Sequence, residues 1–183
     1  MSFPAFFDTN VLYGALLNDY ILHLADRGLF RPLWSEDVLV ELERNLVANG
    51  EDGELVRKRV TTMRRYFPDA MVSGHEELVS AMTNQEKDRH VLAAAIRGGA
   101  EVLVTFNLRD FPTGSTAQFD LEVVHPDAFL LDQLDLYPAA TLRVLSDLVD
   151  GYDSPALTME DYLLALTRAG VPDFVASVRP AIY

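Results

Sequence analysis

Four acidic side chains stand where carboxylates can gather at one place in a folded chain: Asp8, Glu41, Asp88 and Asp110. Clustered carboxylates repel one another and raise each other's pKa, so a fold keeps them together mainly where a hard cation such as Mg²⁺ or Mn²⁺ bridges them. Two such ions about 3.5–4 Å apart activate water and stabilise the leaving oxygen when a phosphodiester is cleaved. The quartet therefore predicts metal-assisted hydrolysis of a phosphodiester.

The first of these residues, Asp8, follows the apolar run from Phe3 to Phe7. A buried parallel strand shows such a continuous apolar block, and the ligands of an open α/β sheet lie beyond the carboxyl ends of its strands. Helical periodicity begins directly afterwards, so Asp8 falls on a strand-to-helix turn. For this motif alone, helix capping by Asp8 or Asn10 is the alternative interpretation.

The other three carboxylates occupy comparable places. Glu41 lies in the second turn of a helix that Ser35 caps, and Asp88 lies in the first or second turn of a later helix. Asp110 follows the clearest strand of the chain, residues 101–105. Taken singly, each residue has another interpretation. Glu41 fits a solvated helix face, Asp88 an acid favoured by the helix dipole, and Asp110 a turn-forming Asp. Their combination with Asp8 favours a common site.

The elements that must position these residues alternate along the chain. Strands are predicted over 3–7, 30–34, 70–72, 101–105 and 121–124. Helices are predicted over 10–28, from 35 to about 50, over 54–67, and up to 97 after a capping box at Thr83 and Glu86. This alternation predicts an α/β fold, a Rossmann-like three-layer α/β/α sandwich with a parallel sheet.

Only helical patterns follow residue 127, over 128–134, 138–149, 158–169 and 172–179. We therefore predict a sheet domain over residues 1–132 and a helical C-terminal extension over 133–183. The apolar residues of the extension are too many to remain in water, so we expect them to pack on the sheet domain or on a partner chain, with a homodimer left open.

Composition narrows the class of protein. The 28 acidic and 15 basic residues give a net charge of −13, which repels nucleic acid at long range and argues against a passive nucleic-acid binder. It argues less against a nuclease, whose metal ions cancel the charge of their ligands. The chain has no cysteine, no run of about 20 apolar residues and no basic start of a signal peptide. We expect a soluble, cytoplasmic protein that does not enter membranes.

Five segments, in this order, resemble the PIN-domain family of ribonucleases, particularly the VapC-type toxins of toxin–antitoxin pairs. They are Phe7–Asn10, Trp34–Leu42, Asp88–Ala95, Val104–Pro112 and His125–Leu130. The resemblance covers about residues 3 to 132. The helical segment that follows is longer than in the compact toxins.

The resemblance implies a metal-dependent endoribonuclease that cleaves RNA through water activated by two Mg²⁺ or Mn²⁺ ions and is held in check by a cognate antitoxin. The metal ligands and catalytic residues would be Asp8, Glu41, Asp88 and Asp110. Thr9 and Asn10 would support the first carboxylate, and Thr105 and Asn107 would shape the rim. Some relatives place the last acidic group nearer to Asn107, so both Asn107 and Asp110 are candidates for the fourth position.

Three other functions compete with the toxin. A housekeeping RNA-processing PIN nuclease uses the same site. A haloacid-dehalogenase-like phosphatase also has Asp after its first strand, but it needs a second Asp where this chain has Asn10. A catalytically silent binding module keeps the fold alone. His90 follows Asp88 by two positions, which places it on the opposite side of a helix, and we do not predict it as a ligand.

Overall fold

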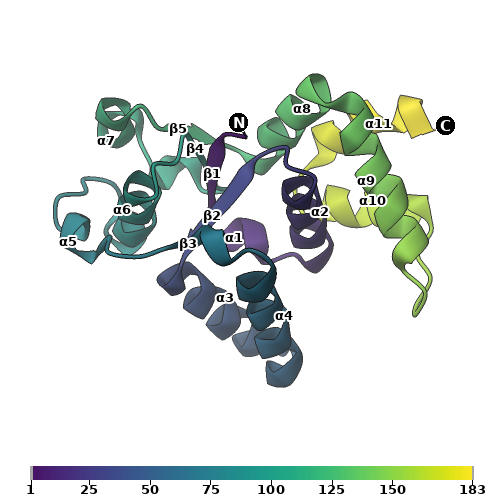
Figure 1. Ribbon diagram of the computed structural model, residues 1–183, viewed down its shortest axis with the longest axis horizontal. Helices are drawn as coiled ribbons and strands as arrows, with labels where there is room; N and C mark the ends of the chain where they lie inside the picture. Colours follow the sequence, from purple (N-terminus) through teal and green to yellow (C-terminus); the bar gives the residue numbers. More distant parts are fainter. Residues whose placement is uncertain (1, 183) are drawn as a thin grey trace.

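The computed structural model describes residues 2–182, and its centre is a parallel five-stranded sheet (Figure 1). The strands are β1 (Pro4–Phe7), β2 (Arg31–Ser35), β3 (Met71–Val72), β4 (Val102–Val104) and β5 (Glu122–Val124). Their order across the sheet is β3-β2-β1-β4-β5, and every neighbouring pair is parallel. The residues that follow β1 and β4 therefore meet at the same edge of the sheet.

Helices cover both faces of this sheet. In chain order they are α1 (Thr9–Leu12), α2 (Ala15–Asp26), α3 (Glu36–Ala48), α4 (Gly53–Tyr66), α5 (Glu76–Val79), α6 (Arg89–Arg97) and α7 (Thr113–Thr116), with 3₁₀ turns at Pro68–Ala70, Glu86–Asp88, Leu108–Asp110 and Ala117–Phe119. Figure 1 shows α6 on one side of the strands and α2 on the other. The predicted three-layer α/β/α architecture is confirmed.

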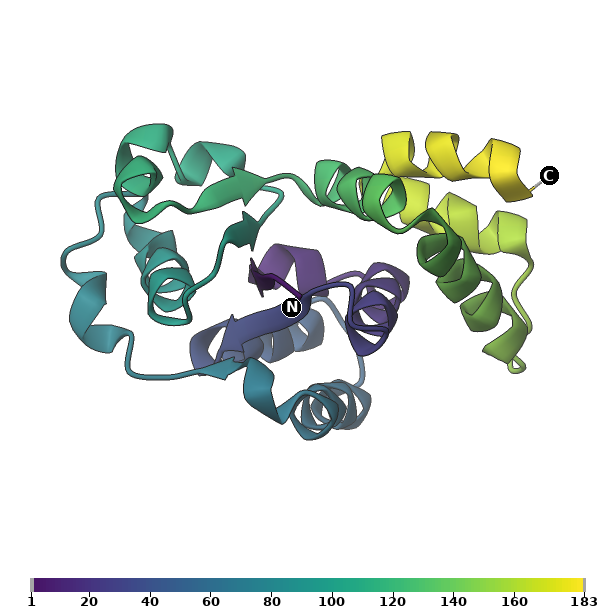
Figure 2. The same ribbon diagram turned by 45° about the horizontal axis from the view of Figure 1, so that its top comes forward.

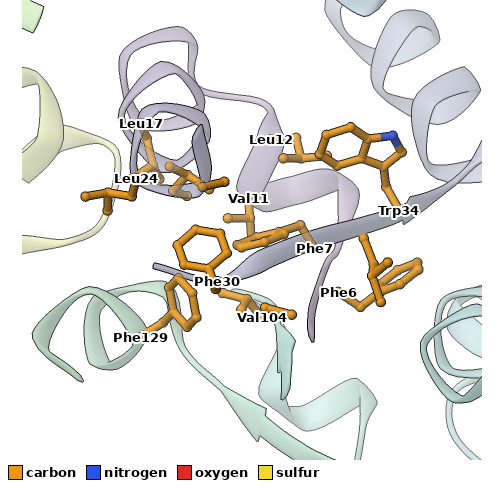
Figure 3. Close-up of a cluster of buried hydrophobic side chains, with 14 of the residues drawn as sticks. Phe6, Phe7, Val11, Leu12, Leu17, Leu24, Phe30, Trp34, Val104 and Phe129 are labelled. Atoms are coloured by element: carbon orange, nitrogen blue, oxygen red, sulfur yellow. The ribbon is translucent and has the colours of Figure 1, made fainter. Parts of the chain in front are cut away.

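The central strand β1 contributes to the core on both faces. Successive side chains of a strand point to opposite faces, so Phe6 and Phe7 enter different layers (Figure 3). Phe7 packs against Phe30 and Phe129, with ring centroids 5.6 and 5.5 Å away. Because Phe129 lies beyond the last strand, this aromatic cluster already connects the sheet to the C-terminal part of the chain.

The C-terminal helices are α8 (Pro126–Leu136), α9 (Pro138–Gly151), α10 (Met159–Arg168) and α11 (Pro172–Ile182). Figure 2 shows them grouped beside the sheet. Both α9 and α10 contact α2, where the Tyr20 hydroxyl donates to the Thr141 carbonyl at 3.0 Å and the Tyr162 hydroxyl donates to the Leu16 carbonyl at 2.8 Å. Within residues 2–182, none of the helices has the length and apolar character needed to cross a bilayer.

Two predicted helices differ from the structure. The helix expected over 10–28 is divided into α1 and α2, because Gly14 adopts an extended conformation with φ −67° and ψ 118°. The helix expected to follow a capping box at Thr83 and Glu86 begins only at Arg89. The preceding residues form a 3₁₀ turn instead, in which the Asn84 side chain donates to the Asp88 carbonyl.

The predicted domain division at residue 132 falls inside α8, and Met1 and Tyr183 lie outside the described residues. The exact boundary stays a prediction.

Candidate functional site

Asp8 lies directly after β1 and caps α1 from an extended conformation. Its Oδ1 accepts a hydrogen bond from the Thr9 backbone N–H at 2.7 Å, and its Oδ2 accepts one from the Thr105 hydroxyl at 2.7 Å. Thr105 is within reach because β1 and β4 are parallel neighbours, with Phe7 opposite Val104. Asp8 is therefore both a helix cap and a side chain held rigidly at the edge of the sheet.

Burial raises the pKa of Asp8 above its ordinary value. The hydrogen bonds from Thr105 and Thr9 act in the opposite direction, the negative charge of Glu41 raises the pKa further and His90 lowers it. With only 5% of its surface exposed, this carboxylate lacks much of the hydration that would stabilise its charge. A nearby cation would favour the ionised form.

Asn10 and Thr105 connect the loop after β4 to the start of α1. The Asn10 amide donates to Asp8 Oδ2 at 3.0 Å and to Thr105 Oγ1 at 3.2 Å, while its oxygen accepts from the Phe106 N–H at 3.2 Å. Thr105 Oγ1 also accepts from the Asn107 N–H at 3.1 Å. These contacts make Asn10 and Thr105 positioning residues for Asp8 and for the loop that carries Asn107.

Glu41 enters the site from α3. Its Oε2 accepts a hydrogen bond from the Thr9 hydroxyl at 3.3 Å and lies 3.8 Å from His90 Nε2. Ser35 caps the start of α3 by accepting from the Val38 N–H at 3.3 Å, and this cap follows directly from the end of β2. Glu41 is thereby brought to the same edge as Asp8.

Asp88 and Asp110 share one lysine. Lys87 Nζ lies 2.8 Å from an Asp110 oxygen and 3.5 Å from Asp88 Oδ2. Lys87 holds the pKa of Asp110 below its ordinary value. Burial, together with the neighbouring carboxylates of Asp110 and Asp8, raises the pKa of Asp88 to about 6. Asp88 Oδ2 is buried and has no hydrogen-bond partner among residues 2–182.

These groups surround a cavity of about 360 Å³. Its lining residues are Asp8, Thr9, Asn10, Tyr13, Glu41, Asn45, Lys87, Asp88 and Asn107. Asp110 is outside this lining and reaches it through Lys87. The charge of Glu41 acts on Asp8, that of Asp8 on Asp88, and that of Asp110 on Asp88. The carboxylates therefore influence one another in the order Glu41, Asp8, Asp88 and Asp110.

The residues of the cavity fit divalent cations by their chemistry. Carboxylate, amide and hydroxyl oxygens are the ligands that Mg²⁺ and Mn²⁺ prefer. Asp88 Oδ2 is a buried acceptor that forms no hydrogen bond within residues 2–182, with Lys87 Nζ 3.5 Å away. The fit does not extend to a closed coordination shell, since no three Asp, Glu or His side chains of residues 2–182 lie close enough together to hold one ion. Mg²⁺ commonly completes its coordination shell with water, so one or two of these carboxylates suffice to bind it.

Most of these residues lie in a part of the chain that matches a known protein family. A family model described as "PIN domain" matches residues 4–109, which is more than half of the chain. The chain belongs to the PIN-domain family. A second model, "VapC50 C-terminal domain", matches residues 126–180.

One relative is the protein described as "Putative ribonuclease VapC50" from Mycobacterium tuberculosis (strain ATCC 25618 / H37Rv). It is 48% identical to this chain over 110 residues, which is 60% of this chain and 64% of the relative. The match thus covers less than two thirds of the relative. No solved structure matched the chain.

The PIN-domain match includes most of the predicted site residues. Asp8, Glu41 and Asp88 lie within it, as do Asn107 and the supporting residues Thr9, Asn10 and Thr105. Asp110 lies one position beyond its end. Both candidates for the fourth position are thus near the site, Asn107 in the cavity lining and Asp110 behind Lys87.

The prediction that His90 lies away from the site is wrong. That prediction assumed that Asp88 and His90 occupy one α-helix, whereas Asp88 is the residue before α6, at the end of a 3₁₀ turn. His90 consequently faces Glu41. The sequence interpretation also overlooked Tyr13, Asn45 and Lys87. Asn45 had a usable signal, because it follows Glu41 by four positions and so lies on the same face of α3.

The basic helix α4 is only partly available to a ligand. Arg59 donates to the backbone carbonyls of Leu12 and Tyr13 at the end of α1, and Arg64 pairs with Glu36. Arg57 and its neighbours Lys58 and Arg65 are exposed. The helix therefore supports α1 of the PIN domain with one residue and offers positive charge to solvent with others.

Proposed function

We propose that this chain is a metal-dependent endoribonuclease that acts as the toxin of a toxin–antitoxin pair. The observation that carries the proposal is the cavity at the carboxyl edge of a PIN-domain sheet, which Asp8, Glu41 and Asp88 line. Asp110 lies beside it across Lys87, and Asp88 Oδ2 forms no hydrogen bond within residues 2–182. The relative's description as a "Putative ribonuclease" supports RNA as the substrate.

Asp8 and Asp88 would hold the metal ions, with Glu41 on one side and Asp110 or Asn107 on the other. Bound Mg²⁺ or Mn²⁺ supplies activated water at neutral pH and stabilises the leaving oxygen. Asn10 and Thr105 keep Asp8 Oδ2 oriented, the Thr9 backbone N–H holds Asp8 Oδ1, and the Thr9 hydroxyl orients Glu41. Lys87 carries a positive charge at the rim, where it neutralises Asp110 and attracts a phosphate.

The decisive experiment removes one carboxylate charge at a time without changing side-chain volume. Asp8→Asn and Asp88→Asn are assayed on a structured RNA with Mg²⁺ or Mn²⁺, with the exposed Asp69→Asn as matched control. We expect cleavage to fall at least about a hundredfold in both site variants and to stay at the wild-type level in the control. Cleavage near wild type in either site variant contradicts the proposed site.

Metal binding is tested independently of cleavage. Mg²⁺ or Mn²⁺ raises the melting temperature of the wild type, because a ligand that binds only the folded state stabilises it. A variant with Asp8, Asp88 and Asp110 changed to Asn and Glu41 changed to Gln loses this response. An equal gain in both proteins locates the metal elsewhere.

The proposal also includes a cognate antitoxin, a cytoplasmic location and the possibility of a homodimer. Co-expression with a protein encoded directly upstream, if that protein abolishes RNA cleavage and copurifies, supports the toxin. Cleavage of one defined cellular RNA without such a partner favours the housekeeping nuclease. Metal binding without any cleavage favours the silent binding module. Membership of the PIN family removes the phosphatase alternative.

A further inference from the structure

A second hollow lies at the opposite edge of the sheet. Its volume is about 480 Å³, and it lies between the starts of β4 and β5 and the helix α8. The carboxylates that line it are Glu101, Glu122, Asp132 and Asp135. We call it the acidic hollow. It combines residues of the sheet with residues of the first C-terminal helix, and it is separate from the cavity that Asp8 lines.

The four carboxylates of the acidic hollow are not neutralised. Each of them is exposed, and none forms an ion pair within 4.0 Å in the described part of the chain. No Lys, Arg or His of residues 2–182 lines the hollow. At the candidate catalytic site, by contrast, Lys87 pairs with two carboxylates. The acidic hollow therefore attracts a cation from outside the chain.

A buried amide in the same hollow also lacks a partner. Gln133 lines it with only 1% of its surface exposed, and Gln133 Oε1 has no hydrogen-bond partner among residues 2–182. Its amide nitrogen makes only a long contact, 3.4 Å, with the Phe129 carbonyl. A buried acceptor without a donor costs free energy, which a donor from a ligand recovers. The ligand must then carry N–H groups as well as positive charge.

The apolar part of the hollow restricts the ligand further. Phe3 and Phe129 contribute aromatic rings, and the neighbouring Leu136 leaves 63% of its surface in solvent. A guanidinium is planar, stacks on aromatic rings and forms paired hydrogen bonds with carboxylates. A bare divalent ion gains nothing from contact with these apolar surfaces. No group of three Asp, Glu or His side chains in residues 2–182 is close enough to bind such an ion.

We propose that the acidic hollow binds an arginine side chain from a basic segment of a partner protein, with an apolar neighbour of that arginine covering Leu136. Charge complementarity selects the partner: four unpaired carboxylates repel RNA and attract a basic segment. The hollow and the Asp8 cavity are at opposite edges of the sheet, so a partner bound here leaves the candidate catalytic site open.

Binding is tested with a hexa-arginine peptide by calorimetry, at low and physiological salt. The hollow variant is Glu101→Gln, Glu122→Gln, Asp132→Asn and Asp135→Asn. The matched control neutralises four exposed acids elsewhere, Glu54→Gln, Asp69→Asn, Glu76→Gln and Glu77→Gln, and so changes the net charge equally. We expect affinity at least tenfold weaker in the hollow variant than in the control.

Gln133→Met gives a test that changes no charge. We expect it to weaken hexa-arginine binding at least threefold, and the Gln133 side-chain amide resonance of the wild type to shift on adding the peptide. Equal affinity in the hollow and control variants overturns the proposal, as does an unchanged Gln133 resonance. If hexa-lysine or spermine binds as tightly, the hollow is a general cation site and the guanidinium assignment is wrong. Because no RNA is cleaved in these experiments, their outcome is independent of the proposed ribonuclease function.

Discussion

Two aspartates with buried carboxylate oxygens show how differently the two parts of this chain use the same side chain. Asp127, in the first turn of α8, accepts hydrogen bonds from the backbone N–H groups of Phe174 at 2.7 Å and Asp173 at 3.0 Å, with one oxygen each. Asp88 leaves Oδ2 without a hydrogen bond, and its pKa is raised to about 6. A carboxylate whose buried oxygens are all hydrogen-bonded stabilises a fold, whereas a buried oxygen without a hydrogen bond costs free energy and indicates a place for a ligand.

The same contrast extends to the neighbours of these residues. Where the C-terminal helices meet α2, the hydroxyls of Tyr20 and Tyr162 donate to backbone carbonyls, and the Tyr152 hydroxyl donates to Asp19 at 2.6 Å. At the candidate site, His90 Nδ1 is buried and has no hydrogen-bond partner in the described part of the chain. We infer that the contacts between α2 and the C-terminal helices serve stability and that the sheet edge at Asp8 is kept ready for ligands.

Truncation after Leu134 is the strongest test of this contrast. It removes α9, α10 and α11 and uncovers the buried Tyr20, so we expect most of the protein to become insoluble. Any soluble fraction keeps metal-dependent cleavage, since no proposed ligand is lost. Soluble fraction, circular dichroism and RNA cleavage are compared with the full chain. A truncated protein that is folded but inert with metal shows that the helices take part in catalysis or RNA binding.

Asp127→Ala isolates the structural aspartate. It leaves two N–H groups at the start of α11 without acceptors, and we expect a loss of about 2–4 kcal/mol in the free energy of unfolding. Urea unfolding measures this loss, and the exposed Asp173→Ala serves as control. At temperatures well below its melting transition, we expect the Asp127→Ala protein to cleave RNA at the wild-type rate. A large loss of cleavage in a folded Asp127→Ala protein breaks the division between the two regions.

Arg59→Met tests the support that α4 gives to the site. Without the guanidinium, the Leu12 and Tyr13 carbonyls lose their donor, and α1, which follows Asp8, loses an anchor. We expect about 1–3 kcal/mol less stability and about tenfold slower cleavage. Arg57→Met on the exposed side of α4 is the matched control. If Arg59→Met loses stability but cleaves at the wild-type rate, Arg59 is structural only.

Asp88→Asn sharpens the comparison through pH, measured in chelator. The pKa of Asp88 in the folded protein, about 6, is above its ordinary value of 3.8, so the folded state binds the proton more tightly than the unfolded state. The ionised group therefore destabilises the fold above pH 6, and this cost disappears below pH 4. After allowance for solvent screening, we expect the variant to be more stable than the wild type by about 1 kcal/mol at pH 7. At pH 4 we expect the variant and the wild type to have equal unfolding free energies. Equal unfolding free energies at pH 7 as well would falsify the raised pKa of Asp88.

Much of the fold was predictable because local patterns and the sheet agree. The apolar run before Asp8 is β1, and residues 101–105 contain β4, where a continuous apolar block needs burial on both faces. The break at Gly14 was not predictable, because the apolar positions on both sides of it keep helical spacing. The candidate site was predicted from acidic residues after strands, on a helix and at a helix start, and the structure places Asp8, Glu41 and Asp88 around one cavity.

The sequence by itself determined which groups are available for chemistry: hard oxygen donors, no thiolates, and a strand-to-helix turn that presents Asp8. Only the tertiary structure decided which of them meet. The parallel register of β1 and β4 sets Thr105 against Asp8, and the 3₁₀ turn before α6 directs His90 toward Glu41. These contacts join residues far apart in the chain or depend on a short irregular turn, and no local pattern specifies either, because side-chain direction there follows from packing and not from periodicity.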